Sequence, residues 1–205
     1  MTILSVNKTR ETDGRNAPVF YWMDALRPFF VVKVINMNQK AKNLAQGAMI
    51  AAAYVALTHF QNILIPNSAS FAIQFRASEA LCVLAFFTPA AVPGLTIGCL
   101  LFNLTFAGAL PLDFLVGSLA TFLAAGGMWL CRNWTVGGMP VIGLLLPAVT
   151  NAVLVGWELD MYIGGGFWIN ALYVAIGEAA VLLTLGALLY RVMKKNRLDT
   201  LVFGR

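Results

Sequence analysis

Charged residues are scarce in this sequence, above all in its central part. Only 11% of the 205 residues are charged, whereas about 25% is typical of soluble domains. Just seven charges fall between positions 44 and 190. A soluble domain needs a polar surface, so this distribution excludes an ordinary soluble globule. Because 60% of the residues are hydrophobic, we predict an all-α, polytopic integral membrane protein.

Residue types that bind metals or act as nucleophiles are also few. The chain has three cysteines and one histidine. Cys82, Cys99 and Cys131 lie in apolar stretches without a second ligand at metal-binding spacing, so we predict no metal site. An intramembrane enzyme would need a nucleophile beside a base at mid-depth, and His59, near the end of a span, supplies no such pair. We therefore expect no catalytic residues.

The basic residues gather in the two tails. Residues 1–43 and 191–205 contain twelve of the fourteen lysines and arginines. They are mixed with acidic residues and lack the aromatic–basic interleaving of nucleic-acid-binding tails. Basic flanks of apolar helices mark the cytoplasmic side instead. We predict a cytoplasmic N-terminal arm at 1–43, either interfacial or disordered, a six-helix membrane domain at 44–190 and a basic cytoplasmic tail at 191–205.

The apolar middle divides into six segments at its proline, glycine and polar breaks. The predicted spans cover about 44–65, 77–92, 94–110, 114–131, 139–157 and 167–190. Two cytoplasmic tails require an even number of spans, and six meets this condition. Several segments are at or below the ~17–25 residues usual for a span. We therefore expect tilted or broken helices, packed closely through small residues such as Gly94 and Gly98.

The alternation of spans assigns the seven central charges to two sides. Arg132 falls in a cytoplasmic loop, as the positive-inside rule requires. The other six are predicted in the outer half of the bundle or at its outer face, and they are Arg76, Glu79, Asp113, Glu158, Asp160 and Glu178. A charge inside a membrane span is costly and marks a functional site by default. Glu178, eleven residues into the last span, must be paired, protonated or facing a polar cavity.

These charges also have structural interpretations, which the sequence leaves open. Arg76 and Glu79 are three residues apart, so they either pair on one helical face or contact a ligand. Asp113 suits a helix N-terminus as a capping carboxylate. A solvated outer loop at 158–166 accounts for Asp160, and structural pairing is an alternative for Glu178.

Amides and aromatic rings accompany the carboxylates. The predicted outward-facing cavity contains Glu158, Glu178, Asn103, Asn151, Asn170, Trp157, Trp168, Tyr173, Phe71 and Phe75. Carboxylates beside stacking rings suit a flat heterocycle that presents N–H donors, such as a guanine-like edge. A cationic amine would satisfy the same groups, so the residue types alone do not choose between these ligands.

Several stretches, in order, resemble a known family. They are Ile73–Leu81, Pro93-Gly94 with Gly98–Asn103, Asp113 with Gly117–Thr121, Asn151–Leu159 and Phe167–Glu178. Their order and spacing are similar to the queuosine-precursor (QueT-type) substrate-binding components of energy-coupling factor (ECF) transporters, over about residues 44–190. The resemblance implies a six-helix S-component in the cytoplasmic membrane that binds a 7-deazaguanine base or queuine from outside. The long arm at 1–43 departs from the compact family pattern.

The resemblance also implies partners. S-components associate with a membrane scaffold (the T-component) and two ATPase subunits, so ATP and Mg are expected in the partners and no cofactor in this chain. The first helix would meet the scaffold through an alanine-rich face, formed here by Ala48, Ala52 and Ala56. A self-sufficient secondary carrier for a related heterocycle is the alternative, and inverted halves would favour it. The sequence shows no clear internal repeat.

The family pattern further assigns roles to site residues. Glu178 and Glu158 would bind the guanine-like edge. The amide partners would be Asn103, Asn151 and Asn170, the lid would be formed by Phe75, Arg76 and Glu79, and the stacking rings would be Trp157, Trp168 and Tyr173.

Overall fold

The computed structural model describes residues 38–66 and 75–203. Most of the predicted N-terminal arm, up to residue 37, lies outside the described residues, as does Phe71. A compact unit begins at Gln39.

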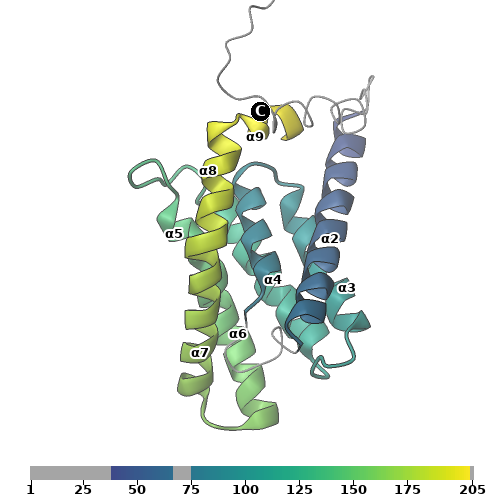
Figure 1. Ribbon diagram of the computed structural model, residues 1–205, viewed down its shortest axis with the longest axis vertical. Helices are drawn as coiled ribbons and strands as arrows, with labels where there is room; N and C mark the ends of the chain where they lie inside the picture. Colours follow the sequence, from purple (N-terminus) through teal and green to yellow (C-terminus); the bar gives the residue numbers. More distant parts are fainter. Residues whose placement is uncertain (1–37, 67–74, 204–205) are drawn as a thin grey trace, which may run out of the picture. The chain divides into compact units, whose positions relative to one another are not determined.

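The described residues form a bundle of helices (Figure 1). In chain order the elements are α2 (Gln39–Leu64), η1 (Ala77–Phe86), α3 (Ala91–Thr105), α4 (Asp113–Leu130), α5 (Val141–Leu144), α6 (Leu146–Ile163), α7 (Phe167–Val181), η2 (Leu182–Gly186), α8 (Ala187–Lys195) and α9 (Leu198–Phe203). Within the described ranges, β-type pairing is limited to one isolated bridge between Val136 and Met139. The predicted all-α class is confirmed.

Four helical stretches are long and apolar enough to cross a membrane. They are Gln39–Leu64, Asp113–Leu130, Val141–Ile163 and Phe167–Lys195. The other two predicted spans correspond to shorter apolar helices, η1 and α3. The chain is therefore a multi-pass membrane protein, while six complete crossings stay a prediction.

The predicted outer loop at 158–166 is wrong in its extent. Helix α6 continues to Ile163, so Glu158 and Asp160 lie on the helix. The chain turns only at Gly164, Gly165 and Gly166, whose φ angles are 79°, 90° and 95°. Side chains disfavour this left-handed backbone, so the three glycines, rather than the acidic residues before them, end the helix.

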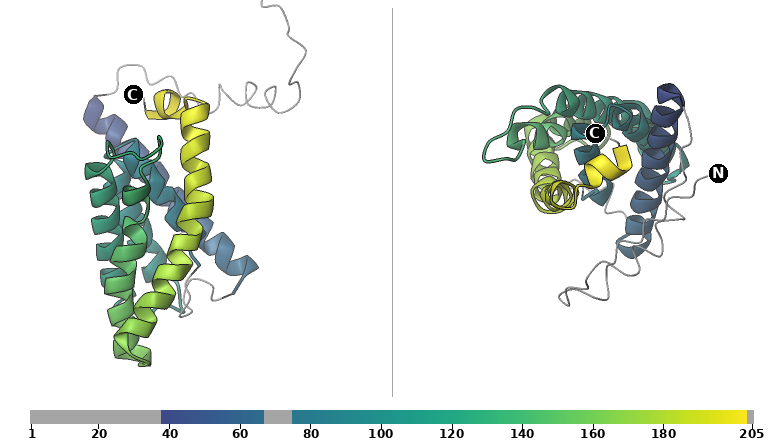
Figure 2. Two further views of the ribbon diagram at one scale, coloured as in Figure 1. Left: turned by 90° about the vertical axis from the view of Figure 1, so that its left-hand side faces the viewer. Right: turned by 90° about the horizontal axis from the view of Figure 1, so that it is seen from above.

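The helix ends gather at two opposite ends of the bundle (Figures 1 and 2). At one end, Lys42 Nζ near the start of α2 donates to the Phe203 carbonyl of α9 at 3.2 Å. We call this the basic end, since the last turn of α8 carries Lys194 and Lys195. At the other end, His59 near the end of α2 contacts Thr105 at the end of α3, with 3.1 Å between Nε2 and Oγ1. We call this the turn end, because the α6–α7 turn also lies there.

The short helix η1 occupies the centre of the bundle and contacts α2, α3, α4, α7, η2 and α8. It is a 3₁₀-helix of ten residues, although runs longer than three or four residues are uncommon. Side chains three residues apart are eclipsed in this geometry. Glu79, Cys82 and Ala85 therefore share one face, and all three are buried. This arrangement delivers a carboxylate to the interior.

Small residues allow α2 and α3 to approach closely, as predicted. A Cβ atom on Gly94 would lie 2.6 Å from the Gly47 carbonyl oxygen. A Cβ atom on Gly98 would lie 2.8 Å from the Tyr54 Cβ atom. The two glycines therefore let the backbones of α2 and α3 pack at a distance that a larger residue would prevent.

Candidate functional site

Five ionisable side chains form a buried cluster toward the turn end. Each is at most 5% exposed. They are Arg76, Glu79, Asp113, Glu158 and Glu178. They come from η1 and the residue before it, α4, α6 and α7. The sequence predicted these charges in one half of the bundle, and the structure brings them together although they are far apart in the chain.

Arg76 supplies the positive charge of the cluster. Its guanidinium group interacts electrostatically with Glu79 and Asp113, and also with Glu158 and Glu178. A buried charge needs such compensation because the surroundings solvate it poorly. Arg76 therefore acts on carboxylates from four different elements.

Both carboxylate oxygens of Glu79 accept hydrogen bonds from protein donors. The Tyr54 hydroxyl donates to Oε1 at 2.6 Å, and the Cys82 thiol donates to Oε2 at 3.2 Å. Tyr54 lies on α2 and is fully buried. Sequence reasoning missed Tyr54, although a phenol within an apolar helix needs a hydrogen-bond partner when buried and was a usable signal.

Asp113 and Asn103 join the end of α3 to the start of α4. Asn103 Nδ2 donates to the Asp113 backbone carbonyl at 2.8 Å. The Asp113 carboxylate accepts the Leu110 N–H at 2.7 Å, so it stabilises the turn before α4 rather than capping the first helical N–H groups. Gly117 leaves room for the amide, because a Cβ atom there would lie 2.9 Å from Asn103 Nδ2.

The other two carboxylates differ from Glu79. Both side-chain oxygens of Glu158, and Oε2 of Glu178, are buried without a hydrogen-bond partner among the described residues. Asp113 is next to Glu158, and the Asn151 side chain is next to Glu178. The great majority of buried polar atoms are hydrogen-bonded, and exceptions call for an explanation such as an absent ligand. The cluster thus contains acceptors available to a donor from outside the described chain.

Asn170 and Asp160 belong to the α6–α7 turn. Asn170 Nδ2 donates to the Gly164 carbonyl at 2.9 Å. The Asp160 carboxylate accepts the Gly166 N–H at 2.9 Å. These bonds hold the glycine turn, so Asp160 has a structural role at the end of α6 rather than in the predicted solvated loop.

The predicted stacking rings are not brought into the buried cluster. Trp168 is 81% exposed and Trp157 is 50% exposed. Tyr173 and Phe75 are exposed as well. Each of these four residues therefore keeps a large part of its surface accessible. The predicted alanine face is also exposed, at Ala48, Ala52 and Ala56 of α2.

No group of three or more His, Cys, Asp or Glu side chains forms a possible metal site in the described ranges. The buried cluster itself consists of four carboxyl groups and one guanidinium group.

Comparison with known proteins identifies the membrane part of the chain. The model of the QueT transporter family matches residues 44–195. No curated protein matches, and no solved structure does. The matched range includes all five ionisable residues of the buried cluster.

Proposed function

This chain belongs to the QueT transporter family, and from that premise we propose that it is the substrate-binding S-component of an ATP-driven ECF importer. Its substrate would be a queuosine precursor, a 7-deazaguanine base or queuine, taken up from outside. The chain would sit in the cytoplasmic membrane with six spans and both termini in the cytoplasm. A T-component scaffold and two ATPase subunits would be its partners, and they would hold ATP and Mg.

The observation that carries this proposal is the set of buried carboxylate oxygens that lack a donor among the described residues. The cluster holds four carboxyl groups and one guanidinium group. A ligand that offers several N–H groups would satisfy Glu158 and Glu178, since leaving such acceptors buried and unpaired is costly. A guanine-like edge offers donors of this kind.

Different roles follow for the individual residues. Glu158 and Glu178 would accept hydrogen bonds from the ligand, with Asn103 and Asn151 beside them. Glu79 is bonded to Tyr54 and Cys82 and would position the cluster together with Arg76.

We propose that the remaining contacts are made at the rim of the site. Asn170 would reach the ligand from the α6–α7 turn, and Phe75 would belong to the lid. Trp157, Trp168 and Tyr173 would offer their exposed ring faces for stacking, a contact worth about 1–3 kcal/mol per base.

A binding titration of the purified full chain tests the substrate class. We expect tight binding of 7-deazaguanine bases, weaker binding of guanine and little binding of a thiamine-like cation. The Glu178→Gln variant should weaken deazaguanine binding by about tenfold or more, because a hydrogen bond to a charged group contributes about 1.5–3 kcal/mol. Asp160→Asn is the matched control, since this carboxylate holds the turn instead. Equal binding by Glu178→Gln would remove Glu178 from the site.

Co-purification and uptake test the coupling to ATPase subunits. We expect the tagged chain to retain a scaffold and ATPase subunits, and uptake to stop when those subunits carry inactive ATP sites. Undiminished uptake by this chain alone would refute the S-component proposal and favour a self-sufficient carrier.

A further inference from the structure

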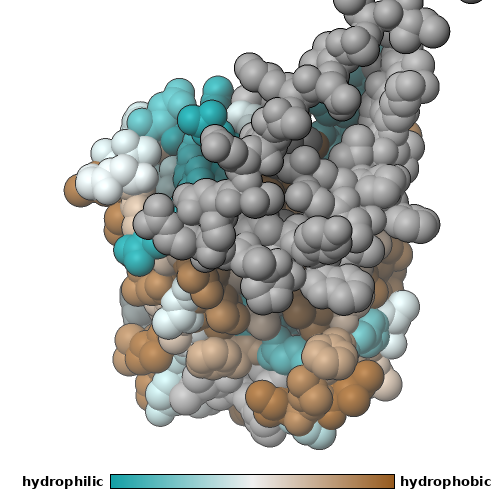
Figure 3. Space-filling model, turned by 45° about the horizontal axis from the view of Figure 1, so that its top comes forward, coloured by the Kyte–Doolittle hydropathy of each residue, from teal (hydrophilic) through white to brown (hydrophobic). Residues whose placement is uncertain are grey.

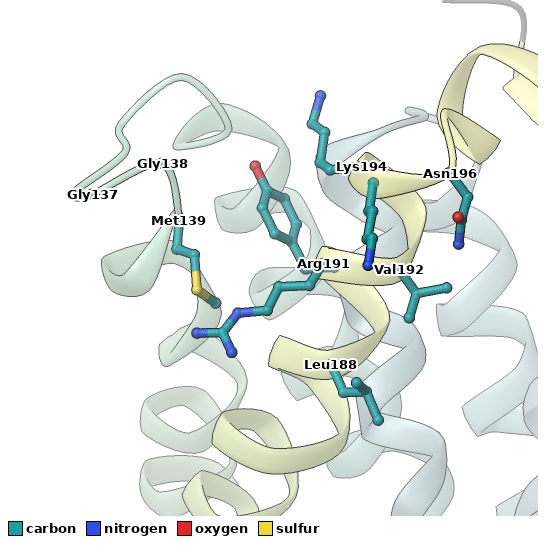
Figure 4. A pocket seen from close by; sticks show the side chains of 10 residues that line it. Gly137, Gly138, Met139, Leu188, Arg191, Val192, Lys194 and Asn196 are labelled. Atoms are coloured by element: carbon teal, nitrogen blue, oxygen red, sulfur yellow. The ribbon is translucent and has the colours of Figure 1, made fainter. Parts of the chain in front are cut away.

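A groove at the basic end is separate from the buried cluster. It has a volume of about 720 Å³ and lies between α8 and the connection that follows α4 (Figure 4). Gly137, Gly138 and Met139 form one side, and α8 contributes Leu188, Arg191 and Lys195. No acidic residue lines it among the described residues. Figure 3 shows hydrophilic residues gathered at this end, above apolar ones.

The groove has positive charge that the described residues leave unpaired. Lys194 Nζ is engaged, because it pairs with the Asp199 carboxylate at 3.1 Å. Arg191 and Lys195 are exposed and form no ion pair with any described residue. Arg191 extends toward Met139 across the groove (Figure 4). An anion in the groove would therefore meet two available cations.

The glycines on the opposite wall leave space for a ligand. Gly137 and Gly138 have φ angles of 59° and 79°, a conformation that favours glycine. A Cβ atom at either position would have nothing within 4 Å. At Gly137 and Gly138 this wall is therefore bare backbone, and Met139 next to them adds its side chain.

The position of the groove across the membrane indicates the source of the anion. The continuous helix Phe167–Lys195 has 29 residues, which is about 43 Å at 1.5 Å per residue. A hydrocarbon core is only ~30 Å thick, so the last turns of this helix extend into the headgroup layer. Leu188, one turn before Arg191 and nearer the middle of this helix, is 59% exposed. A basic side chain next to an exposed apolar one suits a phospholipid, because the lipid phosphate lies next to the acyl chains.

We propose that this groove binds the headgroup of an anionic phospholipid. Arg191 and Lys195 contact the phosphate, and Leu188 and Val192 contact the upper part of an acyl chain. Basic pockets between transmembrane helices on the cytoplasmic side bind such headgroups in general. The proposal requires only that the chain spans a membrane, and it does not depend on the identity of the transported substrate.

Native mass spectrometry of the purified full chain tests this site, with added phosphatidylglycerol or phosphatidylcholine. We expect preferential retention of phosphatidylglycerol. The double variant Arg191→Gln/Lys195→Gln should weaken that retention roughly 20- to 30-fold, because each basic residue near a lipid surface contributes about 1 kcal/mol. Phosphatidylcholine retention should not change. Arg191→Lys, which keeps the charge, should preserve most of the binding.

The matched control is Lys40→Gln/Arg197→Gln. Both residues are exposed, and neither lines this groove. The control removes the same charge and should retain phosphatidylglycerol as the wild type does.

Three results would overturn the proposal. The first is unchanged phosphatidylglycerol retention by the groove variant. If the same variant also no longer co-purifies with partner subunits, the groove binds a protein instead of a lipid. The second is an equal loss in the control, which would indicate bulk charge. The third is displacement of the lipid by inorganic phosphate alone at similar concentration, which would assign the groove to a free anion.

Discussion

The Tyr54 hydroxyl group donates a 2.6 Å hydrogen bond to Glu79 Oε1 and thereby joins α2 to the central helix η1. Both side chains are buried. With Cys82 on the second oxygen, the Glu79 carboxylate has protein donors on both sides. Glu158 lacks such donors among the described residues. This difference distinguishes a carboxylate that joins two helices from the one that we propose binds the ligand.

Tyr54→Phe should lower stability. The change removes the hydroxyl donor and leaves a buried carboxylate oxygen unpaired, which costs about 1–3 kcal/mol. Thermal unfolding in detergent should show a lower Tm. Tyr162→Phe is the control, because that ring is exposed and surface changes are usually within about 0.5 kcal/mol. An unchanged Tm for Tyr54→Phe would mean that this bond contributes no net stability.

Glu158→Gln should lower ligand affinity without lowering stability. Without ligand, the replacement removes a buried carboxylate that has no donor, so the Tm should stay the same or rise. Ligand affinity should fall, because the N–H groups of the ligand lose a charged acceptor.

Glu79→Gln is the matched comparison for Glu158→Gln. It should lower the Tm, since its amide N–H₂ group would face the Tyr54 or Cys82 donor. A fall in Tm for Glu158→Gln as large as for Glu79→Gln would show that Glu158 is structural.

Gly98→Ala should destabilise the bundle despite the better helix propensity of alanine. Its Cβ atom would lie 2.8 Å from Tyr54 Cβ and 3.1 Å from the Ala51 carbonyl oxygen. Overpacking of this kind costs about 1–3 kcal/mol, while propensity returns only about 1 kcal/mol. Gly126→Ala in α4 is the control, because nothing lies within 4 Å of its Cβ position. Its stability, measured by thermal unfolding, should be equal or higher. Equal stability of both variants would contradict close α2–α3 packing.

Ala52→Leu should disrupt partner binding without affecting the ligand. Ala52 lies in the exposed alanine row of α2, where a larger side chain would separate two closely packed helices. Co-purification of partner subunits should decrease, while the ligand Kd stays unchanged. Ala53→Leu, also exposed and about 100° further around the helix, should have a smaller effect. Equal losses from the two variants would refute an alanine-specific contact.

The sequence predicted the helical class, the long spans and the gathering of charges in one half of the bundle. These features follow from the cost of placing charge in a membrane, which makes each such residue conspicuous in an apolar chain. The bond between Tyr54 and Glu79 was not predicted. It depends on the packing of η1 against α2, and no local pattern in the sequence encodes that contact.

The sequence did not predict the exposure of the aromatic rings either. Helices that are apolar all around carry little periodicity, so the sequence does not indicate which face is buried. Trp168 therefore seemed suited to the cavity, yet most of its ring is exposed. The extent of α6 was missed because acidic residues suggested a loop, whereas the glycines after Ile163 end the helix.

The π-helical turn η2 sets the rotational phase between two distant sites. It interrupts the α-helical repeat at Leu182–Gly186, between Glu178 on α7 and Arg191 on α8. Each residue of an α-helix advances the side-chain direction by about 100°. Regular α-helical winding of the same residues, without the π turn, would rotate α8 by about that angle relative to α7. The π-helical turn thus fixes the direction of the Arg191 side chain relative to that of Glu178.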